Sequence, residues 1–336
     1  MKAMRYHQTG GPEVLRLDDV PDPSPGPGEL VVAVKAAAIN RLDVFLRSGS
    51  ASMPGFKLPH TGGFDIAGDV AAVGPGVDPA KVGQAVVVKA RVTGPQSKGR
   101  LDIIGTSRPG GFAEKVLVPA HCIAPKPAGY NYEEAAAFGC VYLTAHYGLI
   151  EHARLQPGEV VLVHAGGSGA GTAAIQVAMA AGATVITTVG SDEKAAKARD
   201  LLHADHVINY KKVNFGDEVR EMTGGRGVDI VFDPVWGATA PISLDCLALR
   251  GRWIVLGMVG GLQSPIDVGK IMFKEITVCG IIEFYADDFQ IDAALRMANR
   301  GLVRPIVSKV WPLAALADAQ RQMEKGDFFG KIVVKP

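Results

Sequence analysis

A cluster of glycines and small residues in the middle of the chain has the composition of a phosphate-binding site. It follows the apolar run Val160 to Val163, and its members are Gly166, Gly167, Ser168, Gly169, Ala170 and Gly171. A loop with so few Cβ atoms lets backbone N–H groups approach a pyrophosphate, and a following helix adds unpaired N–H donors and its positive dipole end. Strand, glycine turn and helix in this order predict a dinucleotide site. The alternative is an ordinary glycine-rich turn.

The residues after the next predicted strand indicate which dinucleotide would bind. An NAD site places Asp or Glu at the end of this strand to bind the ribose hydroxyls. Here the strand ends at Gly190 and Ser191, which leave space for a 2′-phosphate. Lys194 lies one helical turn further, and Tyr210 offers a phenol or a ring face for adenine. The pattern therefore predicts NADPH.

Two acids oppose this prediction. Asp192 and Glu193 follow Ser191 directly, and carboxylates that face the site would repel a phosphate. Their alternative role is favourable negative charge at a helix N-terminus.

The segments around and after the glycine cluster predict a doubly wound parallel sheet, because strands and helices alternate at the spacing of βαβ units. The strands are expected at residues 160–163, 184–189, 206–210, 228–232, 253–256 and 276–282, and the helices at 192–202, 215–223 and 241–249.

The residues before about 125 have a different texture. Short β-like runs alternate with Pro and Gly clusters, which predicts a compact all-β unit. The polar stretch from Arg91 to Gly111 is expected to be a mobile surface loop. After a helical pattern from Tyr132 to Glu151 and the parallel series, the tail predicts a helix at 290–299, a turn at 310–312, a helix at 313–324 and a strand at 331–334.

Bulk composition narrows the class of protein. The chain has 336 residues, 48% of them hydrophobic, and a net charge of +1. Two domains are expected from this length. The near-neutral charge gives no reason to expect a nucleic-acid or membrane partner. Four widely spaced cysteines without a C-x-x-C pair indicate free thiols in a reducing compartment, and a cytoplasmic protein is expected.

Taken together, the segments resemble the zinc-free quinone oxidoreductase group of the medium-chain dehydrogenase/reductase superfamily. The segments that carry the resemblance are AAINRLDVFLRSG, GFDIAGDVAAVGPGV, GGFAE, the glycine cluster, VINY, CLALRGRWIVLG and GKIVV. The resemblance implies a GroES-like β-rich catalytic domain at residues 1–123, a Rossmann NADPH-binding domain at 124–275, and a C-terminal segment, 276–336, that returns to the catalytic domain.

The resemblance also indicates whether the chain would bind zinc. Zinc-dependent relatives have a cysteine where this chain has Asn40 and a histidine where it has Phe64, so only Cys140 keeps a ligand type. Catalytic zinc takes three protein ligands, and the chain is therefore expected to bind no metal. Without a Lewis acid, reduction of an electrophilic acceptor such as a quinone or α,β-unsaturated carbonyl is easier than alcohol oxidation.

The resemblance implies site residues beyond the glycine cluster. Asn40 would hydrogen-bond the nicotinamide ribose or the acceptor oxygen, although it is alternatively a turn-forming Asn. Thr144 would lie near the nicotinamide or simply cap a helix. Tyr142 is either a catalytic phenol or a buried core residue. Asp43 and Asp65 match family positions and are interpreted as structural partners of N–H groups or arginines. Further cofactor contacts are implied for Leu256, Gly257 and Lys331.

The sequence departs from the family at one pocket position, and it leaves two other functions open. Many relatives have a tyrosine where this chain has Phe45, so a bulkier or less polar enone is expected to suit the pocket better than a small quinone. The alternatives are a mainly non-catalytic NADPH-binding protein and a metal-dependent alcohol dehydrogenase. A homodimer is expected because the apolar run 276–282 would form an unpaired sheet edge.

Overall fold

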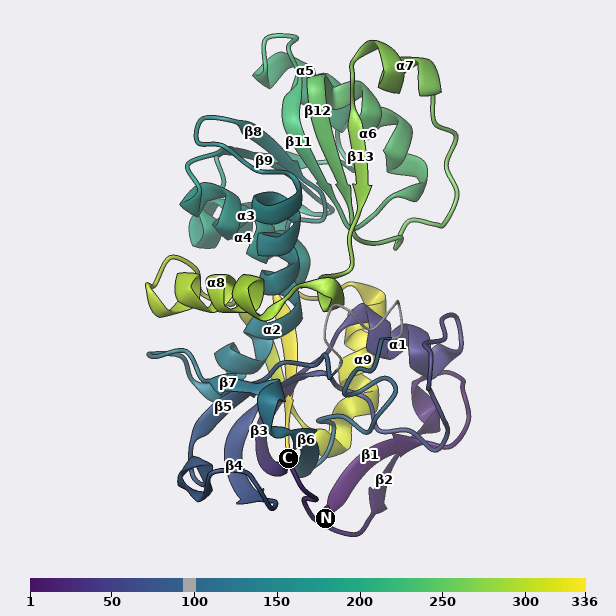
Figure 1. Ribbon diagram of the computed structural model, residues 1–336. Coiled ribbons are helices and arrows are strands. Elements are labelled where there is room, and N and C mark those ends of the chain that lie inside the picture. Colours follow the sequence, from purple (N-terminus) through teal and green to yellow (C-terminus); the bar gives the residue numbers. More distant parts are fainter. Residues whose placement is uncertain (93–100) are drawn as a thin grey trace. The chain divides into compact units, whose positions relative to one another are not determined.

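The computed structural model describes residues 1–92 and 101–336, and the chain divides into two compact units. Unit 1 comprises Met1–Cys140 and Pro305–Pro336, and unit 2 comprises Val141–Arg304 (Figure 1). The expected domain boundaries at 123 and 275 therefore differ from the observed ones. Residues 124–140 lie in unit 1, and residues 276–304 lie in unit 2 because strand β13 extends the parallel sheet of that unit.

Unit 1 is a GroES-like β-rich domain. Its main sheet has the strand order β14-β15-β3-β4-β5-β7, with β6 also paired to β3, and a separate antiparallel pair joins β1 to β2. The strands are β1 (Lys2–Tyr6), β2 (Leu15–Asp19), β3 (Glu29–Ala38), β4 (Asp65–Val73), β5 (Ala85–Val88), β6 (Lys115–Pro119), β7 (Ile123–Pro125), β14 (Val307–Pro312) and β15 (Lys331–Lys335). Their inward side chains, mostly Val, Ile and Leu, fill one hydrophobic core.

Helices in unit 1 correct the expectation of an all-β unit. Helix α1 (Arg41–Ser48) follows β3, and α9 (Leu316–Lys325) precedes the last strand. The guanidinium of Arg47 on α1 is fully buried and binds Gln320 and Glu324 on α9. This contact ties the C-terminal segment, yellow in Figure 1, to the first helix of the chain.

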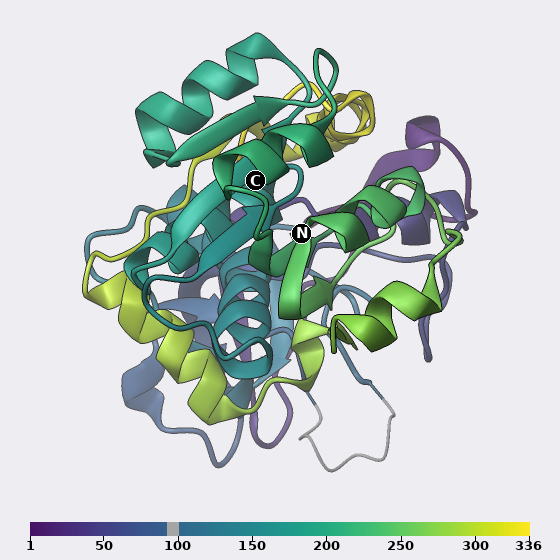
Figure 2. The same ribbon diagram turned by 90° about the horizontal axis from the view of Figure 1, so that it is seen from above.

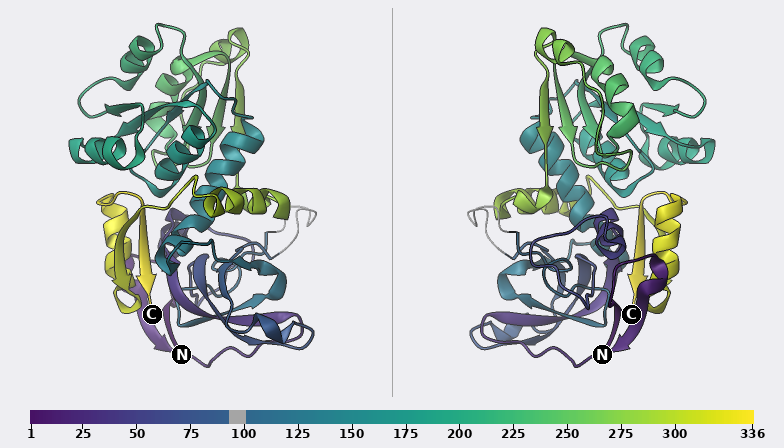
Figure 3. Two further views of the ribbon diagram at one scale, coloured as in Figure 1. Left: turned by 90° about the vertical axis from the view of Figure 1, so that its left-hand side faces the viewer. Right: turned by 90° about the vertical axis from the view of Figure 1, so that its right-hand side faces the viewer.

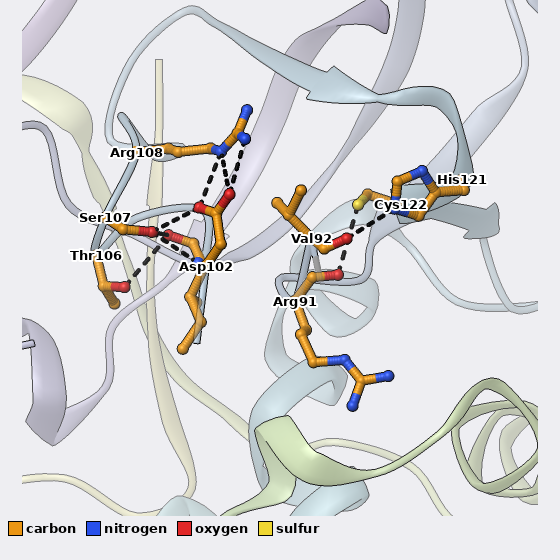
Figure 4. Close-up of polar contacts among 9 residues, drawn as sticks. Arg91, Val92, Asp102, Thr106, Ser107, Arg108, His121 and Cys122 are labelled. Carbon is orange, nitrogen blue, oxygen red and sulfur yellow. Dashed lines mark hydrogen bonds and ion pairs between the residues drawn. The ribbon is translucent and has the colours of Figure 1, made fainter. Parts of the chain in front are cut away.

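Two further sequence expectations for unit 1 need correction, the second of them only at its described residues. Residues 310–312 belong to strand β14 instead of a turn, and their backbone pairs in parallel with β15. In the stretch from Arg91 to Gly111, residues 93–100 lie outside the described part, but Ile103 and Ile104 are fully buried. The nearby Asp102 carboxylate accepts hydrogen bonds from Ser107 and Arg108, so this end of the stretch is packed and bonded (Figure 4).

Unit 2 is a Rossmann domain, as predicted. Its six strands are all parallel, in the order β10-β9-β8-β11-β12-β13, which is the doubly wound order of a dinucleotide-binding sheet. The strands are β8 (Val160–Val163), β9 (Thr184–Val189), β10 (His206–Asn209), β11 (Val228–Asp233), β12 (Leu247–Val255) and β13 (Thr277–Gly280).

Helices cover this sheet, as Figures 2 and 3 show from above and from the sides. They are α3 (Gly169–Ala180), α4 (Asp192–Leu202), α5 (Phe215–Met222), α6 (Ala240–Cys246) and α7 (Val268–Phe273). Helix α8 (Asp288–Asn299) follows β13 and lies beyond the end of the sheet (Figure 1). Helix α2 (Tyr132–His146) contains the boundary between the units and continues as a π-helix, Tyr147–His152. Among the described residues, no helix is long and apolar enough to cross a bilayer.

Candidate functional site

The glycine cluster forms the turn between β8 and α3 at the carboxyl end of the central strand. A Cβ added to Gly166 would overlap the Thr187 hydroxyl, and one added to Gly171 would overlap the Ala165 carbonyl. Only glycine fits these two positions, and the loop can therefore pack flat against β9. The remaining members, Gly167, Gly169 and Ala170, lie in the same loop and in the first turn of α3.

Ser168 begins α3. Its hydroxyl accepts a hydrogen bond from the N–H of Gly171 at 3.0 Å, which is the geometry of an N-cap. The helix that follows is twelve residues long and presents its positive dipole end at this loop. A loop without Cβ bulk at the start of a capped helix fits a pyrophosphate.

The residues expected to bind the adenosine part of the dinucleotide lie together at the end of β9. Ser191 caps α4 and accepts a hydrogen bond from the Lys194 N–H at 3.2 Å. The Tyr210 hydroxyl lies 2.8 Å from the place that a Gly190 Cβ would occupy, so the phenol stands directly over this glycine. Tyr210 itself is 49% exposed, which leaves its ring open to a ligand.

The two acids next to this group are paired with cations. The Asp192 carboxylate lies 2.6 Å from the Lys212 ammonium and accepts a hydrogen bond from the Asn209 amide at 2.8 Å. These bonds, that to Lys212 first, lower the pKa of Asp192. Glu193 binds Lys197 at 2.6 Å, which lowers its pKa in the same way. Sequence reasoning missed these partners, and they weaken the objection to a phosphate at this place.

Leu256 and Gly257 follow β12 at the same edge of the sheet. The Leu256 N–H donates to the Asp233 carbonyl at 3.1 Å, and a Cβ on Gly257 would overlap the Pro234 carbonyl. The carboxyl ends of parallel strands meet at one edge, so these residues lie on the side of the sheet that carries the glycine loop.

Unit 1 contains a second group of predicted residues, buried and polar. The Asn40 amide donates to Asp65 Oδ2 at 2.8 Å, and its Oδ1 accepts from the Lys331 Nζ at 2.5 Å. The Lys331 ammonium also lies 2.9 Å from Asp65 Oδ2. All three side chains are at most 7% exposed. Asp65 Oδ1 accepts from the Cys140 N–H at 2.7 Å, so this carboxylate is the centre of the group.

Asp43 lies beside this group. Its carboxylate accepts hydrogen bonds from the N–H groups of Asn40 and Gly63, at 2.8 and 2.9 Å. Burial raises the pKa of Asp43 to about 7, and the charge of Asp65 adds to the rise, whereas the two N–H bonds and Lys331 oppose it. The interpretation of Asp43 as a structural partner of N–H groups is confirmed.

The two remaining candidates lie on α2. Tyr142 is 2% exposed, and its hydroxyl accepts a hydrogen bond from Gln176 on α3 at 2.8 Å. This is the environment of a core tyrosine, the alternative that the sequence left open. Thr144 is also buried.

The described residues include no group of three or more His, Cys, Asp or Glu side chains that could hold a metal ion. At the positions where the resemblance would put zinc ligands, Phe64 is buried and the Asn40 carbonyl oxygen contacts an ammonium.

Comparisons with known proteins show the family of the chain. A model of the alcohol dehydrogenase GroES-like domain matches residues 26–128, and a zinc-binding dehydrogenase model matches residues 169–299. Human quinone oxidoreductase is 31% identical over 332 residues, which cover 97% of this chain and 94% of the relative. A 2-haloacrylate reductase from a Burkholderia species is 32% identical over 343 residues, covering 98% and 97%.

Solved structures are similar over their full length. A structure described as an NAD-dependent alcohol dehydrogenase matches with a TM-score of 0.93 at 36% identity, covering 100% of both chains. A mycobacterial protein complexed with NADPH matches with a TM-score of 0.84 at 32% identity, again covering 100% of both chains.

Proposed function

Because the chain belongs to the quinone oxidoreductase group of the medium-chain dehydrogenase/reductase superfamily, we propose that it is a zinc-independent, NADPH-dependent reductase of quinones or α,β-unsaturated carbonyls. The observation that carries the proposal is the carboxyl edge of the unit 2 sheet, where the capped glycine loop, Gly190, Ser191 and Tyr210 fit a dinucleotide. The names of the human and Burkholderia relatives support the two acceptor classes.

The preference for NADPH is supported by charge. Lys212 and Lys197 pair with the two acids beside Ser191, and Lys194 lies in the first turn of the same helix. The similar mycobacterial structure holds NADPH, whereas another similar structure is described as NAD-dependent. The discriminating feature in this chain is the absence of a carboxylate at Gly190 and Ser191, where an NAD site would place one.

Independence from zinc is supported by the Lys331–Asn40 contact. An ammonium 2.5 Å from Asn40 Oδ1 would repel a divalent cation placed beside that amide. The matching zinc-binding dehydrogenase model spans residues 169–299, so it does not include Asn40, Phe64 or Cys140, the positions that would have to supply ligands.

In this proposal the nicotinamide supplies hydride, and the chain supplies binding, orientation and hydrogen-bond donors. We assign the pyrophosphate to the glycine loop and the adenosine phosphate to Ser191 and Lys194. Asn40 and Lys331, oriented by Asp65, donate hydrogen bonds to the cofactor or to the carbonyl oxygen on which charge develops. Thr144 is assigned to the nicotinamide end, and Leu256 and Gly257 to the dinucleotide.

The compartment and assembly belong to the same proposal. The four cysteines are free thiols, which supports a reducing, cytoplasmic environment. The proposed assembly is a homodimer, and no nucleic-acid or membrane partner is proposed.

The test is a panel of quinones and enones with NADPH or NADH, followed by the absorbance of the reduced nicotinamide. We expect turnover with NADPH, without added metal and in the presence of a chelator. Tight NADPH binding without turnover on any acceptor would favour a non-catalytic NADPH-binding protein, and turnover that requires zinc would favour an alcohol dehydrogenase.

A further inference from the structure

His164 is a buried histidine that no step of the proposed reaction uses. It follows the last residue of β8 directly and is 2% exposed. Its Nδ1 lies 3.0 Å from the Thr188 hydroxyl of β9, and its Nε2 lies 2.8 Å from the Ser243 hydroxyl of α6. Both ring nitrogens are therefore engaged, with hydroxyl groups of two different elements.

The hydrogen-bond chain fixes the tautomer of this ring. The Ser243 hydroxyl donates its proton to the Thr239 carbonyl at 2.9 Å, so toward His164 it acts as the acceptor. The Nε2–H of His164 then donates to Ser243, and Nδ1 accepts from the hydroxyl of Thr188. Burial lowers the pKa of His164, against the opposing charge of Asp233, which agrees with a neutral ring.

The residue after His164 has a conformation that needs support. Ala165 has a φ of 53°, in the left-handed region that non-glycine residues rarely adopt. Its carbonyl accepts the Ser168 N–H at 2.8 Å and so forms the turn that leads into the α3 cap. A strained conformation of this kind persists only where the surroundings over-determine it, and such residues cluster at ligand sites.

Thr188 joins the ring to the loop. Its hydroxyl binds the His164 ring, while its carbonyl accepts the Gly166 N–H at 2.9 Å. The His164 N–H donates to the Phe232 carbonyl of β11 at 3.1 Å. The residues on both sides of Ala165 are therefore held by hydrogen bonds to neighbouring strands.

We propose that His164 is a positioning residue for the dinucleotide: its ring ties β9 and α6 to the glycine loop and holds Ala165 in the conformation that the phosphate site requires. The inference rests on the proposed function, since it assumes that the loop binds a dinucleotide. It adds a residue that touches no ligand and acts through the backbone of its neighbours.

The experiment measures NADPH dissociation constants by calorimetry without acceptor, so that turnover plays no part. His164→Phe keeps the volume of a ring and removes both hydrogen bonds. We expect it to weaken NADPH binding by about ten-fold, the effect of one to two lost hydrogen bonds. His164→Asn retains an amide near the place of Nδ1 and is expected to restore part of the affinity.

Val161→Ala is the matched control. Val161 is fully buried on β8, three residues before His164, and lies away from the loop. This variant should lower the melting temperature and leave the NADPH dissociation constant unchanged. If His164→Phe fails to fold, Thr188→Val provides the second variant, because it removes only the hydroxyl that faces Nδ1, and it should weaken binding in the same direction.

The outcomes separate the two proposals. Wild-type protein that binds NADPH, with an unchanged dissociation constant in His164→Phe or in its substitute Thr188→Val, would show that His164 is an ordinary core residue and would overturn this inference alone. Wild-type protein that binds neither NADPH nor NADH would overturn the proposed function and this inference with it.

Discussion

Lys331 and Asp65 are 266 residues apart in the chain, and their charged atoms lie 2.9 Å apart inside unit 1. The register of the strands explains why these two residues lie so close together. Ala38 at the end of β3 pairs with Asp65 on one side and with Val333 on the other. The strand that carries Lys331 is the last in the chain, and it brings a buried ammonium to Asn40, two residues after Ala38.

Loss of the Lys331 ammonium should destabilise unit 1. Lys331→Met keeps most of the side-chain volume and leaves the Asp65 carboxylate buried with no cation beside it. Removing one partner of a buried ion pair costs about 3–5 kcal/mol, and we expect a loss of this size in the unfolding free energy from urea denaturation.

The control for this prediction is the double variant Lys331→Met with Asp65→Asn. With both charges gone, no uncompensated charge remains, so the double variant should lose less stability than the sum of the two single variants. Additive losses would show that the two groups do not interact.

The protein should need no metal for activity. Phe64 stands where zinc-dependent relatives have a histidine ligand, and the Asn40 carbonyl oxygen accepts a hydrogen bond from the Lys331 ammonium. Elemental analysis after dialysis should find zinc well below one ion per chain, and a chelator should leave turnover unchanged. Stoichiometric zinc together with chelator-sensitive turnover would contradict this prediction.

The sequence predicted most of unit 2 because its signals are local, although α7 was not expected and residues 247–249, expected to end a helix, begin strand β12. Most strands of the Rossmann sheet are short apolar runs, and helices α3 and α4 begin at side-chain caps, Ser168 and Ser191. Unit 1 was predicted less completely. Helix α1 is only eight residues long, and the strand that contains Trp311 has an irregular pairing with β15, so neither gives a clear periodic signal.

The site was predicted in its parts but not in its connections. The composition of the glycine loop and of Gly190 and Ser191 predicted the dinucleotide-binding group, and the family resemblance predicted Asn40 and Lys331. The bonds that orient these groups join distant segments, as Asp65 does for Lys331 and Lys212 for Asp192. Such pairs depend on sheet register and turn geometry, and no single sequence encodes them as a motif.

Asp43 should make stability depend on pH. Its pKa rises from 3.8 to about 7 on folding, so the folded state binds the proton more tightly than the unfolded state. The contribution of Asp43 to stability is therefore present below about pH 4 and is lost as the pH rises toward about 7. The unfolding free energy of the wild type, measured relative to Asp43→Asn, should fall between these values. A constant difference would contradict the raised pKa.

The free edge of the unit 2 sheet should be a dimer contact. Strand β13 is the last in the strand order, and Val278 on it is 43% exposed. An apolar edge with unpaired backbone groups favours pairing with a second copy. Light scattering at micromolar concentration should give a dimer mass for the wild type and a lower mass for Val278→Glu.

Leu201→Glu is the control for the dimer. Leu201 is 56% exposed on α4, away from the sheet edge, so this variant should keep the mass of the wild type. A wild-type protein that is monomeric, or equal masses for the wild type and the Val278 variant, would contradict the edge contact.

Lys194 should discriminate between the two cofactors. It lies in the first turn of α4, whose cap is Ser191, and the neighbouring acids are paired with other lysines. A charge-assisted contact to a 2′-phosphate contributes about 1.5–3 kcal/mol. Lys194→Ala should therefore raise the Michaelis constant for NADPH about ten-fold or more and barely change that for NADH. Lys211→Ala, a change of an exposed lysine just after Tyr210, measures the effect of general charge loss and should have a smaller effect. If Lys194→Ala changed the Michaelis constants for both cofactors equally, or if the wild type used NADH as well as NADPH, the residues at the end of β9 would not recognise the 2′-phosphate.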